Sequence, residues 1–141
     1  MSEVFDPPDG FTPHTRRSPL TEPWEPIWAK QTPDRLILGL LARQAHCNGR
    51  GLVHGGLMAA LADNAMGLSC HTAALAAGFT ISGLLTASLQ VSYLGRADVG
   101  QWLSFETEFV KLGKTLSFAD LVVRADGRPV AKASASFAMP G

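Results

Sequence analysis

Residues 48–67 read NGRGLVHGGLMAALADNAMG, and the rest of the sequence is arranged around them. Gly55 and Gly56 precede a run of good helix formers, and no Ser, Thr or Asp occupies the position that would cap the helix. The first backbone N–H groups of such a helix stay free beside the positive end of its dipole. Because glycine lets a ligand approach the backbone closely, we expect this helix start to bind an oxyanion.

The helix that follows contains a single carboxylate, that of Asp63. At about 100° per residue, this acid falls among small residues, and leucines occupy the opposite face. We expect the leucine face to pack against a sheet. The small-residue face is expected to meet either a ligand of Asp63 or a second subunit beside which Asp63 is merely solvated or hydrogen-bonded. The leucine face holds Leu57, Leu61, Leu68 and Leu75, and the small-residue face holds Gly56, Ala59, Ala60, Met66, Gly67, Cys70 and Ala74.

The composition limits the classes of protein to which the chain can belong. Its 141 residues suit one domain, and a formal net charge of zero gives no electrostatic basis for binding nucleic acid or a membrane surface. Hydrophobic residues make up 46% and charged residues 17%, which favours an oligomer. Cys47 and Cys70 form no disulfide framework, so a reducing cytoplasm is the expected setting. Residues 57–79, the longest apolar stretch, are interrupted by polar side chains and are not expected to span a membrane.

Two units are expected along the chain. Residues 1–25 form a proline-rich extended arm, whose first ten residues have no apolar core of the signal-peptide type. Residues 26–141 form the folded domain. This domain is expected to begin with a short strand or helical turn at 27–31 and a strand at 35–47, and its helix is expected to stop at Gly78.

From Ser82 onward the hydrophobic period changes to two, which predicts antiparallel strands. The turn pairs Gly113–Lys114 and Asp126–Gly127 separate the last three strands. The pattern predicts an α+β fold in which a curved antiparallel sheet of five to six strands wraps one long central helix. The strands are expected at 85–94, 102–112, 115–124 and 130–137, with Leu85, Ala87, Leu89, Val91 and Tyr93 making the first strand half-buried and Leu103, Phe105 and Phe109 forming one side of the second.

One pattern joins the helix start to the strands: Asn48-x5-His54-Gly55-Gly56-x6-Asp63, then Thr86 at the head of the first strand and Gly113–Lys114 between the second and third. This pattern resembles the hotdog-fold acyl-CoA thioesterases of the PaaI-like (phenylacetate-pathway) group, over about residues 26–138. The resemblance implies a hotdog fold and hydrolysis of an acyl-CoA thioester to free acid and CoA. It also implies a homodimer, or a dimer-of-dimers homotetramer, with its active site at the dimer interface.

The resemblance assigns roles to five residues. Asp63 corresponds to the acid of the family, acting as general base or nucleophile, and Gly55 corresponds to the residue whose backbone N–H forms the oxyanion hole. Asn48 matches a loop amide that orients water or substrate, and His54 matches the histidine beside the oxyanion glycine. Thr86 matches a hydroxyl near the acid. Asp63 and Gly55 are expected to come from different subunits.

Three of these residues also have a purely structural interpretation. Asn48 and the glycine after it form a common turn pair. His54 would serve equally well as a packed imidazole bonded to a loop carbonyl, and Thr86 as a polar strand residue.

The substrate is expected to contact a second set of residues. Arg96, Lys111 and Lys114 lie in loops or near a hairpin, and they are candidates for binding the phosphates of CoA. Gly56 at the helix start and Met66, as apolar lining, complete the expected substrate-binding set. No cofactor is expected, and no metal site either, because the four histidines lack partner ligands at the required spacing.

Three other functions remain open at the level of sequence. A hydratase or dehydratase of the same fold usually has a His and a Pro-Gly element before the helix, but no proline lies between Pro33 and Pro129. A non-catalytic acyl-CoA sensor would keep the pocket and lose the catalytic groups. A structural protein would use the small-residue helix face for assembly alone.

Overall fold

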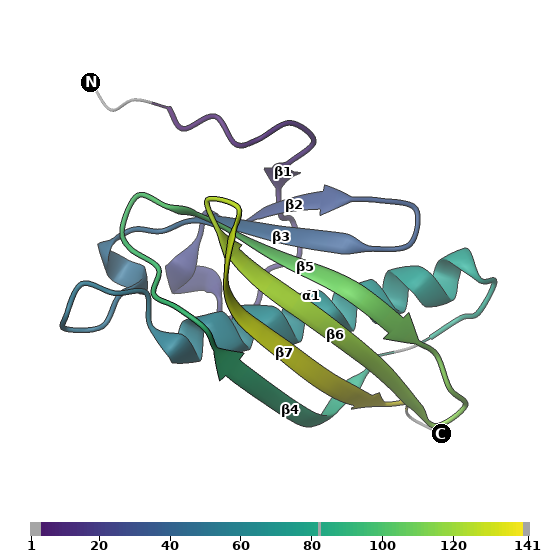
Figure 1. Ribbon diagram of the computed structural model, residues 1–141. Helices are drawn as coiled ribbons and strands as arrows, with labels where there is room; N and C mark the ends of the chain where they lie inside the picture. Colours follow the sequence, from purple (N-terminus) through teal and green to yellow (C-terminus); the bar gives the residue numbers. More distant parts are fainter. Residues whose placement is uncertain (1–3, 82, 140–141) are drawn as a thin grey trace.

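One long helix, α1 (Gly55–Ala76), lies against one face of a curved antiparallel sheet (Figure 1). The computed structural model describes residues 4–81 and 83–139. Its sheet has seven strands in the order β1-β2-β3-β5-β6-β7-β4, so β1 and β4 are the edges. Two short 3-10 helices are η1 (Glu22–Trp24) and η2 (Gln44–His46). The strands are β1 (Thr12–Pro13), β2 (Trp28–Gln31), β3 (Leu36–Leu41), β4 (Leu85–Tyr93), β5 (Trp102–Lys111), β6 (Leu116–Ala125) and β7 (Arg128–Ala138).

The predicted architecture, a single long helix wrapped by a curved antiparallel sheet, is confirmed with seven strands in place of five to six. The unforeseen strand is β1, which comes from the proline-rich arm and pairs with β2. The strand expected at 35–47 ends at Leu41 and is followed by η2. Residues 1–3, Ser82 and residues 140–141 lie outside the described residues, and so do the parts of the predictions that fall on them.

The core face of α1 is wider than the sequence indicates. Leu57 and Leu61 are buried as expected, but Met66 and Cys70, from the predicted small-residue face, are also fully buried. Leu75, from the predicted leucine face, is 54% exposed. The prediction of two separate faces is therefore wrong for the second half of the helix. The reason is the curvature of the sheet, since α1 contacts β3, β4, β5, β6 and β7 and is covered around much of its circumference.

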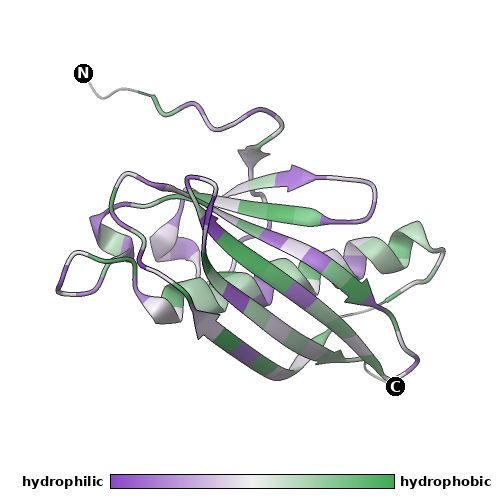
Figure 2. Ribbon diagram, in the orientation of Figure 1, coloured by the Kyte–Doolittle hydropathy of each residue, from purple (hydrophilic) through white to green (hydrophobic). Residues whose placement is uncertain are grey.

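Strand β4 is exposed along most of its length, and the prediction of a half-buried strand is wrong for the chain by itself. It pairs with β7 on one side, and its other edge is open among the described residues. A bulge between Thr86 and Ser88 also breaks the alternation that the sequence shows. Figure 2 shows the strands banded in hydrophilic and hydrophobic colours, and β4 carries hydrophobic bands although it lies at the margin of the sheet. Leu85, Leu89 and Tyr93 are therefore exposed apolar side chains on an open edge.

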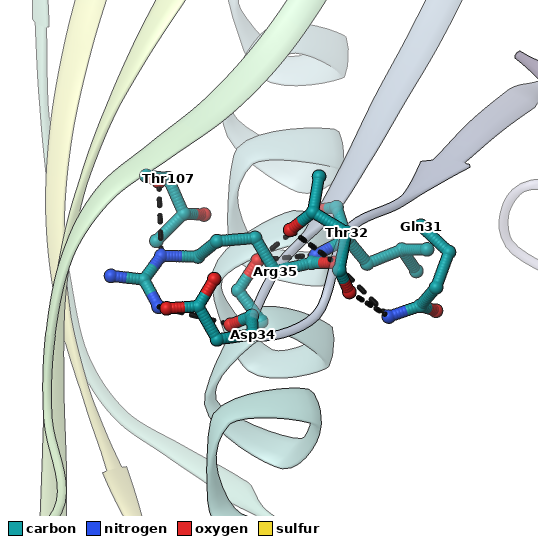
Figure 3. Close-up of polar contacts among 7 residues, drawn as sticks. Gln31, Thr32, Asp34, Arg35 and Thr107 are labelled. Atoms are coloured by element: carbon teal, nitrogen blue, oxygen red, sulfur yellow. Dashed lines mark hydrogen bonds and ion pairs between the residues drawn. The ribbon is translucent and has the colours of Figure 1, made fainter. Parts of the chain in front are cut away.

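A second bulge corrects the prediction for β5. Thr107 continues the buried series of Leu103 and Phe105, but the register shifts between Thr107 and Phe109, so Phe109 is 49% exposed. Arg35 fixes the backbone at this bulge, because its Nε donates to the Thr107 carbonyl oxygen at 3.2 Å (Figure 3). This hydrogen bond thus connects the residue before β3 to the middle of β5.

Ser69 links α1 to the same region of the sheet. Its buried Oγ accepts a hydrogen bond from the Leu36 N–H at 3.2 Å and donates one to the Leu36 carbonyl oxygen at 3.1 Å. Replacing Ser69 with alanine leaves both backbone groups unpaired, so we expect a loss of about 2 kcal/mol in the free energy of unfolding. Chemical denaturation measures this loss. Ser134→Ala removes an exposed hydroxyl and should change the stability far less, so equal losses would contradict the interpretation.

The two predicted hairpin turns have different outcomes. Asp126 and Gly127 form a two-residue turn, and their φ angles of 48° and 83° are the left-handed pair that a type I′ turn requires. The prediction of a two-residue turn at Gly113–Lys114 is wrong, because residues 112–115 all lie between β5 and β6. Gly113 is required there for another reason: a Cβ atom at this position would overlap the Leu116 carbonyl group.

The proline-rich arm is anchored to the outer face of the sheet by aromatic side chains. The Phe11 ring meets Trp102 edge-on with centroids 5.1 Å apart, and Phe5 lies 5.7 Å from Trp102 and 6.1 Å from Trp28. Gly39 on β3 leaves the space that the Trp102 indole fills. The arm is therefore packed on the domain over the residues that the structure describes.

Replacing Gly39 with alanine should test this aromatic packing. The new Cβ would overlap the six-membered ring of Trp102 and also approach Phe11. Overpacking of this kind costs about 1–3 kcal/mol, and proteolysis within the arm should become faster. Gly49→Ala is the matched control, since nothing lies within 4 Å of its Cβ position. Unchanged denaturation and proteolysis of the Gly39 variant would rule out a tight contact.

Candidate active site

Asp63 and Thr86, which are 23 residues apart in sequence, meet at the surface of the domain. Asp63 lies in the third turn of α1 and Thr86 near the start of β4. The Thr86 hydroxyl donates a hydrogen bond of 2.8 Å to Asp63 Oδ1. The bulge after Thr86 comes directly beyond this contact, so the backbone of β4 is locally shaped at the point where the hydroxyl reaches the acid. The carboxylate is thereby held in one orientation, with Oδ2 left for another partner.

A cavity of about 370 Å³, called here the Asp63 cavity, contains both residues in its lining. The domain supplies the apolar part of the wall and the carboxylate. The arm supplies a polar part, which the sequence did not indicate. The apolar lining is Ile27, Leu38, Leu61, Leu68, Leu84 and Phe137, and the arm contributes His14, Arg16, Arg17, Ser18 and Thr21.

The start of α1 is capped, contrary to the prediction from the missing Ser, Thr or Asp. His54 precedes the helix, and its Nδ1 accepts a hydrogen bond of 2.8 Å from the Gly56 N–H. An imidazole nitrogen thus takes the part that a hydroxyl or carboxylate usually plays. The Gly55 N–H has no hydrogen-bond acceptor among the described residues. Gly55 is therefore the glycine whose amide is free for an oxyanion, whereas the Gly56 amide is already used.

Asn48 shapes the loop before the helix. Its Oδ1 accepts hydrogen bonds from the Arg50 N–H at 2.9 Å and the Leu52 N–H at 3.2 Å. This is the turn-forming role that the Asn-Gly pair suggested as an alternative. The carbonyl end of the side chain is occupied by the loop, so the Nδ2 group is the part of the amide that could contact a ligand.

Tyr93 is a residue that the sequence analysis did not assign to the site. It ends β4, and its hydroxyl donates a hydrogen bond of 2.6 Å to the Gly55 carbonyl oxygen. A Cβ atom at Gly55 would lie 3.1 Å from the Tyr93 ring. The alternation of β4 placed Tyr93 on the apolar face, which gave no sign that its hydroxyl would bind the first helical residue.

Within one chain, the helix start and Asp63 do not share a cavity. Gly55 and Asp63 are eight residues apart, which is about 12 Å along a helix axis. Asn48, His54 and Gly55 are absent from the lining of the Asp63 cavity. His54 instead lines a second cavity of about 380 Å³ at the helix start.

The expected substrate-binding cations lie apart from one another. Arg96 forms an ion pair of 3.1 Å with Asp98 in the loop beside the helix start. Lys111 and Lys114 lie at the hairpin between β5 and β6, at the opposite end of the sheet (Figure 1). Met66 is fully buried in the core and does not line the Asp63 cavity. A single chain therefore does not bring these residues into one site.

Two histidines lie where the arm meets the domain, His46 buried and His14 half-buried. His46 is 1% exposed, its Nδ1 accepts from the Arg43 N–H at 3.0 Å, and its Nε2 donates to the Trp24 carbonyl oxygen at 2.8 Å. Burial lowers the pKa of His46 below its usual 6.5, opposed by the hydrogen bond to Trp24. Burial also lowers the pKa of His14; the carboxylate of Glu25 opposes this shift, and the charge of Arg16 lowers the pKa further.

These pKa shifts predict that the fold loses stability in mild acid. A histidine whose pKa is lowered in the folded state is protonated more readily in the unfolded chain, so its contribution is complete above the ordinary pKa of 6.5 and declines below it. The loss should reach at most about 1.4 kcal/mol per pH unit for each histidine. Urea denaturation between pH 7.5 and 5.5 measures the slope, and His46→Gln should flatten it. Parallel slopes for the two proteins would contradict the assignment to His46.

Two kinds of site are not found in the part of the chain that the structure describes. No helix there is both long enough and apolar enough to cross a membrane. Residues 4–81 and 83–139 also contain no group of three or more His, Cys, Asp or Glu side chains arranged to hold a metal ion.

Comparison with known proteins identifies the family. The Thioesterase superfamily matches residues 50–132. The Pseudomonas aeruginosa protein named "Putative esterase PA0474" is 35% identical, over 97% of this chain and 100% of its own length. Human acyl-coenzyme A thioesterase 13 is 32% identical, over 71% of this chain and 69% of its own length.

Solved structures show the same fold. A hypothetical thioesterase from Streptococcus pneumoniae, solved with coenzyme A, has a TM-score of 0.73 at 22% identity and covers 84% of this chain and 91% of its own. A mutant of the phenylacetic acid degradation protein PaaI from Thermus thermophilus has a TM-score of 0.74 at 20% identity. The match covers 87% of this chain and 100% of the PaaI chain. These structures confirm the predicted hotdog fold and its likeness to a PaaI protein. The superfamily match and the acyl-coenzyme A thioesterase relative confirm the enzyme class, a thioester hydrolase. The chain belongs to the Thioesterase superfamily.

Proposed function

We propose that this protein hydrolyses acyl-CoA thioesters to a free acid and CoA, with Asp63 as the catalytic carboxylate. The observation that carries the proposal is the 2.8 Å hydrogen bond from Thr86 to Asp63 Oδ1 at the wall of a cavity large enough for a small acyl group. The names of the relatives support CoA as the carrier: one is an acyl-coenzyme A thioesterase, and one structure was solved with coenzyme A.

The proposed reaction needs a base or nucleophile and an oxyanion donor. Asp63 takes a proton from water as the water oxygen attacks the thioester carbonyl carbon, or attacks that carbon itself through Oδ2. The carbonyl oxygen becomes negatively charged and accepts a hydrogen bond from the Gly55 N–H. Collapse of the tetrahedral intermediate breaks the carbon–sulfur bond, and the thiolate of CoA leaves. After general-base attack the product is the free acid, whereas after attack by Oδ2 it is an acyl–Asp63 anhydride, which water then hydrolyses to the free acid and the Asp63 carboxylate. Thr86 keeps the carboxylate in position throughout.

The proposal places each active site between two chains. The base and the donor lie about 12 Å apart along one helix, so one chain cannot present both to the same carbonyl. A two-fold axis near Ala59 would set Asp63 of one chain opposite the helix start of the other. The open edge of β4, with exposed Leu85, Leu89 and Tyr93, is a surface on which a second β4 strand could pair. A homodimer of this kind, or a dimer of such dimers, covers that edge.

Release of free thiol tests the proposed function. The purified protein is incubated with short, medium, long and aromatic acyl-CoAs, and a thiol-detecting reagent reports CoA release. Hydrolysis of any member above the uncatalysed rate supports the proposal. Hydration of crotonyl-CoA without thiol release would show a hydratase, and tight binding of an acyl-CoA without turnover would show a binding protein. Either result would exclude a thioesterase.

A further inference from the structure

The proline-rich arm forms one wall of the Asp63 cavity. Five of its side chains line the cavity that also holds Asp63 and Thr86, and all five are polar or charged. The match to the Thioesterase superfamily covers residues 50–132 and does not include the arm. The arm is nevertheless placed where a substrate in the Asp63 cavity would be in contact with it.

The arm is fixed on both sides of the segment that faces the cavity. Before it, Thr12 and Pro13 pair with β2, and the His14 N–H donates to the Ile27 carbonyl oxygen at 2.8 Å. After it, Thr21 is buried against the domain, and its hydroxyl shares a 3.0 Å hydrogen bond with that of Ser18, which closes a turn within the arm itself. Residues 15–20, called here the arm loop, are therefore held across the cavity by their two ends.

The η1 segment that follows the arm loop is anchored as well. The Arg43 guanidinium donates to the carbonyl oxygens of Pro23 at 3.1 Å and Glu25 at 2.8 Å, and His46 donates to the carbonyl oxygen of Trp24. These bonds connect the arm to the loop between β3 and α1. The position of the cavity wall is thus set by hydrogen bonds to the domain.

The two arginines of the arm loop differ in their partners. Arg17 forms an ion pair of 3.3 Å with Glu25. Arg16 is exposed, lines the cavity, and has no carboxylate within ion-pair distance among residues 4–81 and 83–139. Arg16 is therefore a cation at the rim of a cavity whose domain side carries six apolar side chains, and it is available to an anionic ligand.

We infer that Arg16 selects acyl thioesters whose acyl chain ends in a carboxylate. The inference rests on the proposed function, because the thioester carbonyl must lie at Asp63. The methylene groups of a short dicarboxylic acyl chain would contact the apolar lining, and the distal carboxylate would reach the arm loop. The phosphates of CoA are separated from the sulfur by the whole pantetheine chain, so a cation that shares a cavity with the catalytic carboxylate is placed for the acyl end of the substrate. Arg16 is a specificity residue, and the bond cleavage does not depend on it.

A pair of isosteric substrates tests the inference. Glutaryl-CoA and 5-methylhexanoyl-CoA differ only in that a terminal carboxylate replaces an isopropyl group of nearly the same shape. We expect wild-type protein to have the higher kcat/KM for glutaryl-CoA. Arg16→Gln should reduce kcat/KM for glutaryl-CoA about tenfold, as expected for the loss of a charge-assisted hydrogen bond, and leave that for 5-methylhexanoyl-CoA within about twofold. Arg16→Lys should restore part of the preference, because the charge is kept.

The control variant and the overturning results separate this inference from the proposed function. Lys132→Gln removes one positive charge from an exposed position on β7. It should leave kcat/KM unchanged for both substrates. Equal losses for the two substrates in Arg16→Gln would show that the arginine binds the phosphates of CoA, which overturns the inference and leaves the thioesterase intact. A wild-type preference for 5-methylhexanoyl-CoA would overturn it as well. Failure to hydrolyse any thioester would instead refute the proposed function.

Discussion

Asp63→Asn should lower kcat for acyl-CoA hydrolysis by about 1,000-fold, the usual contribution of a general base or a carboxylate nucleophile. The amide has nearly the same shape as the carboxylate and can still accept the hydrogen bond from Thr86, so the domain should fold normally. What the amide lacks is the negative charge needed to accept a proton or attack a carbonyl. Steady-state thiol release measures kcat, and denaturation confirms that stability is retained.

Asp120→Asn is the matched control for this prediction. Asp120 also accepts a hydrogen bond from a hydroxyl, that of Ser134 at 2.8 Å, but it lies exposed on the outer face of β6. The same chemical change there should leave turnover intact. If Asp63→Asn retained the wild-type rate, Asp63 would not be the catalytic group, whatever its position in the cavity.

Gly55→Pro should reduce kcat by about 100-fold or more by removing one oxyanion donor. Proline suits the first position of a helix, and the extended backbone of His54, with φ −66° and ψ 131°, is the conformation that a residue before proline prefers. Gly55→Ala is the control, because it adds the same Cβ near the Tyr93 ring, 3.1 Å away, and keeps the N–H. Turnover of the alanine variant should therefore remain much closer to wild type.

Mixing the two inactive variants tests whether the site is shared between chains. A dimer with Asp63→Asn in one chain and Gly55→Pro in the other would contain one site with both lesions and one site with none. Purification of such mixed dimers through two different affinity tags should yield about half of the wild-type turnover. Each chain would carry one lesion in its own site if the site lay within a chain, and the mixed dimers would then be as inactive as their parents.

The fold was predictable because its signals are local. The helix is long and ends within two residues of Gly78, and the type I′ turn at Asp126–Gly127 follows from the preference of these two residues for positive φ. The bulges in β4 and β5 were not predictable, because they depend on how neighbouring strands pair. The exposure of Phe109 follows from such a bulge, because strict alternation would place Phe109 with Leu103 and Phe105.

For the candidate site, the sequence nominates residues but does not give their contacts. Gly55 and Asp63 are named from the helix start and from the single carboxylate of the helix, and their catalytic roles stay predictions. The sequence does not predict the cap made by His54, because histidine is seldom the acceptor at a helix start. It does not predict the hydrogen bond of the Tyr93 hydroxyl either, because strand alternation shows which face of the sheet a side chain lies on and not which atom it binds. The position of the arm against the domain is the largest feature that the sequence does not predict. Its composition indicates an extended chain, but the contacts that fix it depend on Arg43 and His46, about 20 residues further along.

The arm loop is a short span fastened at both ends to a rigid body, and such spans accept insertions and deletions at little cost to stability. Each change in its length would enlarge or shrink the Asp63 cavity while the acid, the hydroxyl beside it and the helix start stay where they are. Natural variation at residues 15–20 can therefore change which acyl groups fit the cavity while the proposed catalytic groups keep their positions.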